Sequence, residues 1–87
     1  ELINLNINDN LIKFIEVDGL KGLDKLSNIF LTFNLIKSLE NIDMPKNLKQ
    51  YDLRANSIKI VQSEFFNKFQ TLTELFVDEN NIIDLYV

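Results

Sequence analysis

Apolar and polar residues alternate in a short stretch near the start of this chain, and the stretch ends at an Asn. Counting from Leu2 as position 1, Leu5 and Ile7 occupy positions 4 and 6, Asn10 occupies position 9 and Ile12 occupies position 11. The same frame recurs three times, as Leu26-x-x-Ile29-x-Leu31-x-x-Asn34-x-Ile36, Leu48-x-x-Tyr51-x-Leu53-x-x-Asn56-x-Ile58 and Leu72-x-x-Leu75-x-Val77-x-x-Asn80-x-Ile82.

Each copy of the frame predicts one short strand followed by a bend. Alternation over positions 3 to 7 places positions 4 and 6 on one face of a strand and positions 3, 5 and 7 on the other. An Asn at position 9 stands where the strand turns toward the core, and its amide can donate to and accept from backbone groups that the bend leaves unpaired. The four Asn residues are 24, 22 and 24 residues apart, so the strands of successive copies are expected to lie side by side in a parallel sheet.

The four copies resemble the leucine-rich repeat family, whose repeats are about 20–29 residues long. The resemblance implies an α/β solenoid, a right-handed coil with a short-stranded parallel sheet on its concave face and mostly irregular or short helical returns on its convex face. It also implies that Asn10, Asn34, Asn56 and Asn80 stack into a structural ladder and bind no ligand. The chain is then one segment of repeats, with copies at 2–25, 26–47, 48–71 and, incomplete, 72–87.

The return segments between the strands are less regular than the strands. In the first return, Phe14, Ile15, Val17, Leu20 and Leu23 are expected to fill the core. The third return, residues 61–70, predicts a helical turn or two, because Phe65, Phe66 and Phe69 recur at helical spacing and Ser63 suits an N-cap. Phe66 and Phe69 are expected to be core wedges between layers.

Neither end of the chain carries a polar terminal repeat that would cover the core of its last coil. We therefore expect a piece of a longer protein, with a tendency to self-associate through its uncapped ends.

The outward positions of the frame (2, 3, 5, 7 and 8) line the predicted concave face and are the candidate binding surface. Position 5 holds Phe30 and Phe76, and position 8 holds Phe33; large exposed aromatic side chains are common anchors of protein interfaces. The alternative is that Phe30 and Phe76 only cover their neighbours.

Charge is the second feature of these outward positions. They hold Asp9, Asp52, Glu74, Asp78 and Glu79 against Lys49 and Arg54, a net charge of −3 out of −4 for the whole chain. An acidic face suits a basic segment of a partner, although acidic residues also keep an exposed sheet soluble. Arg54 is expected to pair with Asp52 or Asp78. The candidate binding residues are therefore Phe30, Phe33, Asp52, Arg54, Phe76, Asp78 and Glu79.

Missing residue types exclude much chemistry. The chain has no Cys and no His, so it has no disulfide, thiol nucleophile or imidazole base. Its net charge of −4 weighs against nucleic acid and anionic membranes as partners. Asp78 and Glu79 lack the spacing of a calcium loop. We therefore expect no catalysis, cofactor or metal in this segment.

The sequence predicts a protein-interaction module that binds a partner protein or peptide through its concave face. Two alternatives remain: a regulatory or targeting segment of a larger enzyme such as a protein kinase, and an extracellular recognition segment of a receptor or pathogen surface protein. The chain shows no Cys, signal peptide or Asn-x-Ser/Thr sequon, which leans toward an intracellular location.

Overall fold

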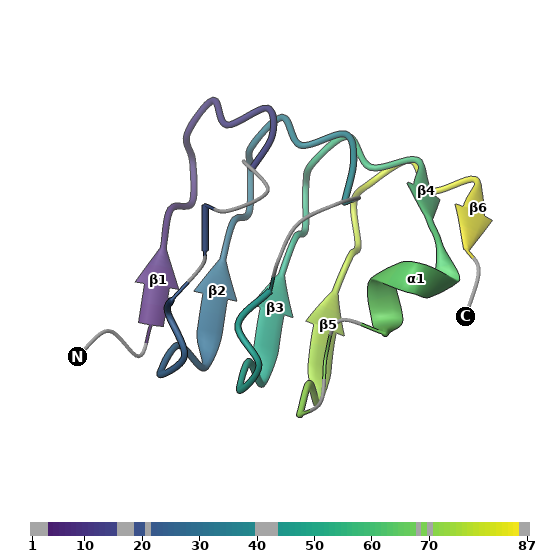
Figure 1. The fold of residues 1–87 in the computed structure, drawn as a ribbon. Coiled ribbons are helices and arrows are strands. Elements are labelled where there is room, and N and C mark those ends of the chain that lie inside the picture. The colour runs from purple at the N-terminus through teal and green to yellow at the C-terminus, as the bar shows by residue number, and fades with distance from the viewer. Residues whose placement is uncertain are drawn as a thin grey trace.

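Four short strands of this computed structural model lie side by side in one parallel sheet (Figure 1). The structure describes residues 4–15, 19–20, 22–39, 44–67, 69 and 71–85. The sheet has the order β1-β2-β3-β5, and each strand belongs to one copy of the sequence frame. The strands are β1 (Asn4–Asn6), β2 (Asn28–Phe30), β3 (Gln50–Asp52) and β5 (Glu74–Phe76).

The strands pair without any offset between copies of the frame. Position 4 pairs with position 4 throughout, from Leu5 through Ile29 and Tyr51 to Leu75. The pairing continues beyond the strands, since the backbone N–H of Leu31 donates to the carbonyl of Asp52 at 2.9 Å. A small parallel sheet with little helix is compatible with a leucine-rich-repeat-like coil.

The core lies on the face of the sheet that positions 4 and 6 occupy, as the alternation predicts. The apolar frame positions of the two middle copies are at most 2% exposed, and each fully buried aliphatic side chain stabilises the fold by about 1.5–3 kcal/mol. The equivalent residues of the first and last copies that the structure describes are only partly buried, because each of these copies has one neighbour in place of two. The buried middle residues are Leu26, Ile29, Leu31, Ile36, Leu48, Tyr51, Leu53 and Ile58.

The third return contains the expected helix, which is a single turn. The return passes from β4 (Ile60–Val61) into the helix α1 (Ser63–Phe66). Strand β4 pairs in parallel with β6 (Asp84–Leu85) (Figure 1). The predicted N-cap was wrong by one residue: Gln62 takes the extended cap conformation, because the chain remains in a strand up to Val61 and the helix begins at Ser63.

Aromatic side chains of the third return pack on the sheet. Phe65 is buried, and Phe69 is partly buried against Phe65 and Tyr51, with ring centroids 5.0 and 6.2 Å away. The expected wedge role of Phe69 agrees with these contacts. The same expectation for Phe66 concerns a side chain outside the described residues.

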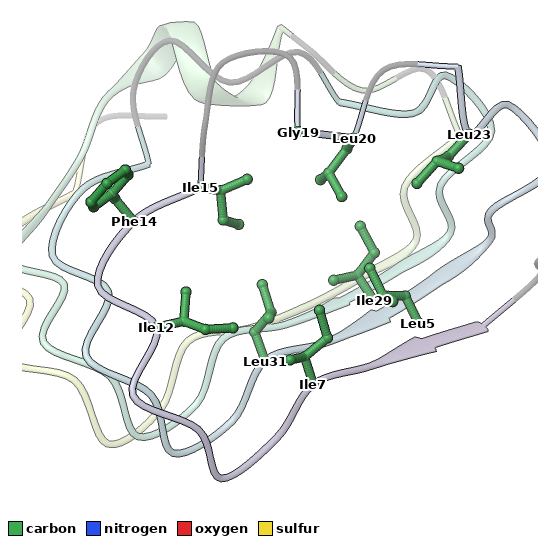
Figure 2. Close-up of a pocket in the computed structure, with 10 residues that line it drawn as sticks. All are labelled: Leu5, Ile7, Ile12, Phe14, Ile15, Gly19, Leu20, Leu23, Ile29 and Leu31. Carbon is green, nitrogen blue, oxygen red and sulfur yellow. The ribbon is translucent and has the colours of Figure 1, made fainter.

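The first return fills the core less completely than the sequence predicts. Leu20 is buried, but Phe14 is 67% exposed, so its predicted core role was wrong. The apolar side chains of the first copy border an open cavity of about 420 Å³ beside β1, with Phe14 at its margin (Figure 2). Val17 lies outside the described residues. Among the residues that the structure describes, no helical stretch has the length and apolar character needed to span a bilayer.

Candidate functional site

The Asn at position 9 of the middle copies links two neighbouring coils. Asn56 donates from Nδ2 to the carbonyls of Leu31, Leu53 and Arg54 at 2.9, 3.0 and 3.3 Å, and its Oδ1 accepts from the N–H of Ile36 at 3.1 Å. Leu31 and Ile36 belong to the preceding copy of the frame. The amide therefore satisfies backbone groups of two coils at once, at a position that is only 8% exposed.

Asn34 and Asn80 make the same set of contacts, each with its own coil and the coil before it. Each accepts a hydrogen bond from the N–H at position 11 of the preceding copy, Ile12 for Asn34 and Ile58 for Asn80. Asn10 differs: within the described residues, its Nδ2 donates to the carbonyls of Ile7 and Asn8, both in its own copy.

The residue at position 8 has a left-handed backbone in every copy. Asp9, Phe33, Ala55 and Glu79 have φ angles of 58°, 56°, 57° and 59°. This conformation costs an L-residue about 1–2 kcal/mol, and Gly or Asn usually supplies it. Since none of the four is Gly or Asn, the sequence predicted the bend at position 9 but not the left-handed conformation at position 8.

The exposed side of the four-stranded sheet, formed by positions 2, 3, 5, 7 and 8, is called here the sheet face. Its position-5 residues form a row across the sheet, because the register pairs Asn6 with Phe30, Phe30 with Asp52 and Asp52 with Phe76. The row thus places one carboxylate between two aromatic rings on neighbouring strands.

Arg54 covers this carboxylate. Its Nε donates to Asp52 Oδ1 at 3.0 Å and its Nη2 donates to Oδ2 at 2.6 Å, while the guanidinium carbon lies 4.9 Å from the centroid of the Phe76 ring. Paired hydrogen bonds of this kind fix both side chains. The sequence allowed Arg54 to pair with Asp52 or Asp78, and the structure shows Asp52 as its ion-pair partner.

Burial of Asp52 corrects its predicted role as a binding residue on the sheet face. The residue is 3% exposed, because Arg54 lies over it and a Phe strand neighbour stands on either side. Its carboxylate is already committed to Arg54. Asp52 therefore holds the Arg54 side chain in place and offers no free charge to a partner.

The remaining predicted residues of the sheet face are accessible to different extents. Phe33 is 59% exposed at the bend after β2, whereas Phe30 and Phe76 are half-buried within the row. Asp78 and Glu79 are exposed beyond the end of β5. Three aromatic rings and two free carboxylates thus share one side of the molecule.

The negative charges of Asp78 and Glu79 act on the guanidinium of Arg54. Its hydrogen bond to Asp52 raises the pKa of the guanidinium, and the charges of Asp52, Asp78 and Glu79 raise it further. Arg54 thus stays a cation among carboxylates. Nowhere in the described part of the chain do three or more carboxylates gather in a way that would hold a metal ion.

Comparison with known proteins gives one informative similarity. Over 82 residues the chain is 30% identical to Keratocan of Danio rerio, a leucine-rich-repeat proteoglycan of the extracellular matrix. The alignment covers 94% of this chain but only 23% of Keratocan. No protein-family model and no solved structure matches the chain. The similarity suggests leucine-rich repeats and a protein-interaction module, and it does not support the intracellular location that the sequence predicted.

Proposed function

We propose that this chain is a leucine-rich-repeat segment, wound as a right-handed solenoid, that binds a basic segment of a partner protein through its sheet face. The observation that carries the proposal is the row of Phe30, Asp52 and Phe76 with Arg54 locked over it. This arrangement fixes aromatic surface in place before any partner arrives, which lowers the entropy lost on binding.

Aromatic side chains supply the anchors. Phe33 projects from the bend and leaves more than half its surface to solvent. Phe76 presents the stacked platform that it forms with Arg54. Aromatic residues and Arg dominate interface hot spots because they bury large, rigid surfaces.

Free carboxylates supply the preference for a basic partner. Because Arg54 and Asp52 neutralise each other, Asp78 and Glu79 leave an uncompensated negative end beside the aromatic rings. Such a field accelerates encounter with a cationic segment and disfavours acidic ones.

A cationic peptide probe tests this function. A fluorescein-labelled dodecapeptide of alternating Lys and Leu is titrated with the chain, and anisotropy gives its affinity. Phe33→Ser is expected to weaken binding about tenfold or more, as an anchor should, while the control Phe14→Ser, a comparably exposed ring off the sheet face, leaves affinity unchanged. Equal effects of the two substitutions would contradict the proposal.

Charge is tested with a second matched pair of variants. Asp78→Asn with Glu79→Gln should weaken binding and flatten its salt dependence, whereas Asp24→Asn with Glu64→Gln removes the same charge from exposed positions elsewhere. If both doubles behave alike, net charge rather than the sheet face determines binding.

The repeat organisation belongs to the same proposal. Copies at 2–25, 26–47, 48–71 and 72–87 each contribute one strand to the binding surface, and the segment itself catalyses no reaction. Because each copy contributes one strand to the four-stranded sheet, the candidate residues recur at matching positions.

A second candidate function is extracellular recognition, which the similarity to a matrix proteoglycan favours. It uses the same sheet face in a different compartment. Fractionation of cells that express the protein tests this candidate: recovery from the medium supports the extracellular function, and recovery from the cytosol opposes it.

A further inference from the structure

A second surface of the coil carries the opposite charge to the sheet face. Positions 10 and 12 of each copy flank the inward residue at position 11, so an extended chain directs both outward. Figure 2 shows Ile12, at position 11, pointing into the cavity. We call this surface the lysine face; it consists of Leu11, Leu35, Ser57 and Asn81 at position 10 and Lys13, Lys37, Lys59 and Ile83 at position 12.

The coils are held together at these positions, so equivalent residues form columns. The N–H of Leu35 donates to the carbonyl of Ile12 at 2.8 Å, and the N–H of Ser57 donates to the carbonyl of Ile36 at 2.9 Å. Neighbouring chains bonded in this way lie about 4.8 Å apart, so the Lys column spans about 10 Å.

Lys is the only charged residue type among the eight positions of the lysine face. None of its eight residues is acidic, and within the described ranges Lys13, Lys37 and Lys59 are exposed and form no ion pair. Three ammonium groups on adjacent coils repel one another. A negative ligand along the column would relieve that repulsion.

The column borders a recess suited to acidic oxygens. Lys37, Ser57, Lys59 and Asn81 line a recess of about 330 Å³ that is open to solvent. Each of these side chains offers an N–H or O–H donor. Apolar residues continue the surface in both directions, because Leu11 is 81% exposed and Ile83 is 75% exposed.

We propose that the lysine face binds an acidic, partly apolar segment of a partner protein, extended along the Lys column. Its carboxylates pair with Lys13, Lys37 and Lys59, and its apolar side chains lie against Leu11 and Leu35. Three or four residues of extended chain are enough to follow the column, at about 3.3–3.6 Å per residue.

The surroundings of the column favour a narrow peptide over an anionic membrane. Asp9 and Glu79 are exposed at the bends two residues before Leu11 and Asn81. A broad anionic surface would meet these carboxylates together with the lysines, whereas an extended segment contacts the column alone.

An acidic peptide probe tests the proposal, and its result is informative because the chain itself is negative and should repel such a probe. A fluorescein-labelled dodecapeptide of alternating Glu and Leu is titrated with the 87-residue chain at low salt, and anisotropy is measured. Lys37→Gln with Lys59→Gln is expected to weaken binding about tenfold. The control, Lys25→Gln with Lys46→Gln, removes the same charge from exposed positions off the face and should change affinity less than about twofold.

Two further measurements decide between explanations. Thermal melts check that both double variants keep the fold, which exposed Lys→Gln changes should spare. Equal losses in the two doubles, or no binding of the probe by the unmodified chain, overturn the proposal. Cosedimentation with phosphatidylserine vesicles that depends on Lys37 and Lys59 also overturns it, in favour of a lipid surface. Phe33→Ser alters the sheet face only. Its effect on the binding of the cationic probe therefore tests the proposed function independently of the lysine face.

Discussion

Replacement of Asn56 by Ala isolates one buried backbone group. Of the carbonyls that accept from Asn56, Leu31 O also accepts from Asn34 Nδ2 at 3.0 Å and Leu53 O also accepts from Asn80 Nδ2 at 2.9 Å. The carbonyl of Arg54 accepts from the N–H of Phe33 as well. Each of these three carbonyls therefore keeps a hydrogen-bond donor in the Asn56→Ala variant.

The backbone N–H that donates to Asn56 has no second acceptor among the described residues. Oδ1 of Asn56 is the partner of the Ile36 N–H, and Ile36 is fully buried. An unpaired buried N–H costs about 1–3 kcal/mol, and the small void left by the amide adds to it. We expect Asn56→Ala to lower the free energy of unfolding by about 2–4 kcal/mol.

Urea unfolding measures this loss, with Asn10→Ala as the matched control. Asn10 is exposed and accepts no hydrogen bond from a backbone N–H of the described residues, so its loss should cost less than about 1 kcal/mol. Amide exchange adds a local readout, because the Ile36 N–H should lose protection in Asn56→Ala. Equal costs for the two variants, or an Ile36 amide that stays protected, would refute the role given to the Oδ1 acceptor.

Four further measurements test the structure. Tyr51→Phe should stabilise the fold by about 1 kcal/mol in thermal melts, because the buried Tyr51 hydroxyl has no hydrogen-bond partner among the described residues. Burial also raises the pKa of Tyr51, so the unfolded chain loses this proton first and stability falls as the pH rises above about 10; alkaline melts of Tyr51→Phe should show a shallower fall. Ala55→Gly should raise stability by up to about 1 kcal/mol in the same assay, because Gly relieves the left-handed strain at a small entropic cost in the unfolded state. Sedimentation should show concentration-dependent association, since Leu5 and Val77 at the two ends of the sheet stay only partly buried; a monomer at all concentrations would contradict this.

Local alternation was enough to predict which side chains point inward. Leu31 and Leu53 are buried and Arg54, directly after Leu53, is exposed, as a period of two requires. Burial of Asp52 was beyond that reasoning, because it depends on how Arg54 folds back and on which residues the next strands place beside it. Exposure of Phe14 likewise depends on neighbouring coils and not on its own sequence context.

A repeated sequence pattern marks the lysine face, although it lies beyond the strand positions 2 to 8. Asn-Leu-Ile-Lys occurs twice and Asn-Ser-Ile-Lys once, each directly at the bend. The predicted binding surface did not include these lysines, because they stand at position 12 and not at the strand positions 2 to 8. Only the pairing of coils at Ile12 and Leu35 shows that equivalent Lys residues form one column.

The in-phase pairing of the strands has a consequence for how such a chain tolerates changes in length. The second copy is two residues shorter than the first between its Asn and the next, yet Asn28, Gln50 and Glu74 still pair position for position. The return segment absorbs the difference. Insertions and deletions in the return segment leave the rows of the sheet face and the Lys column of the lysine face aligned. Duplication of a whole coil would therefore lengthen the acidic and the basic surface together, without rotating either surface away from its ligand.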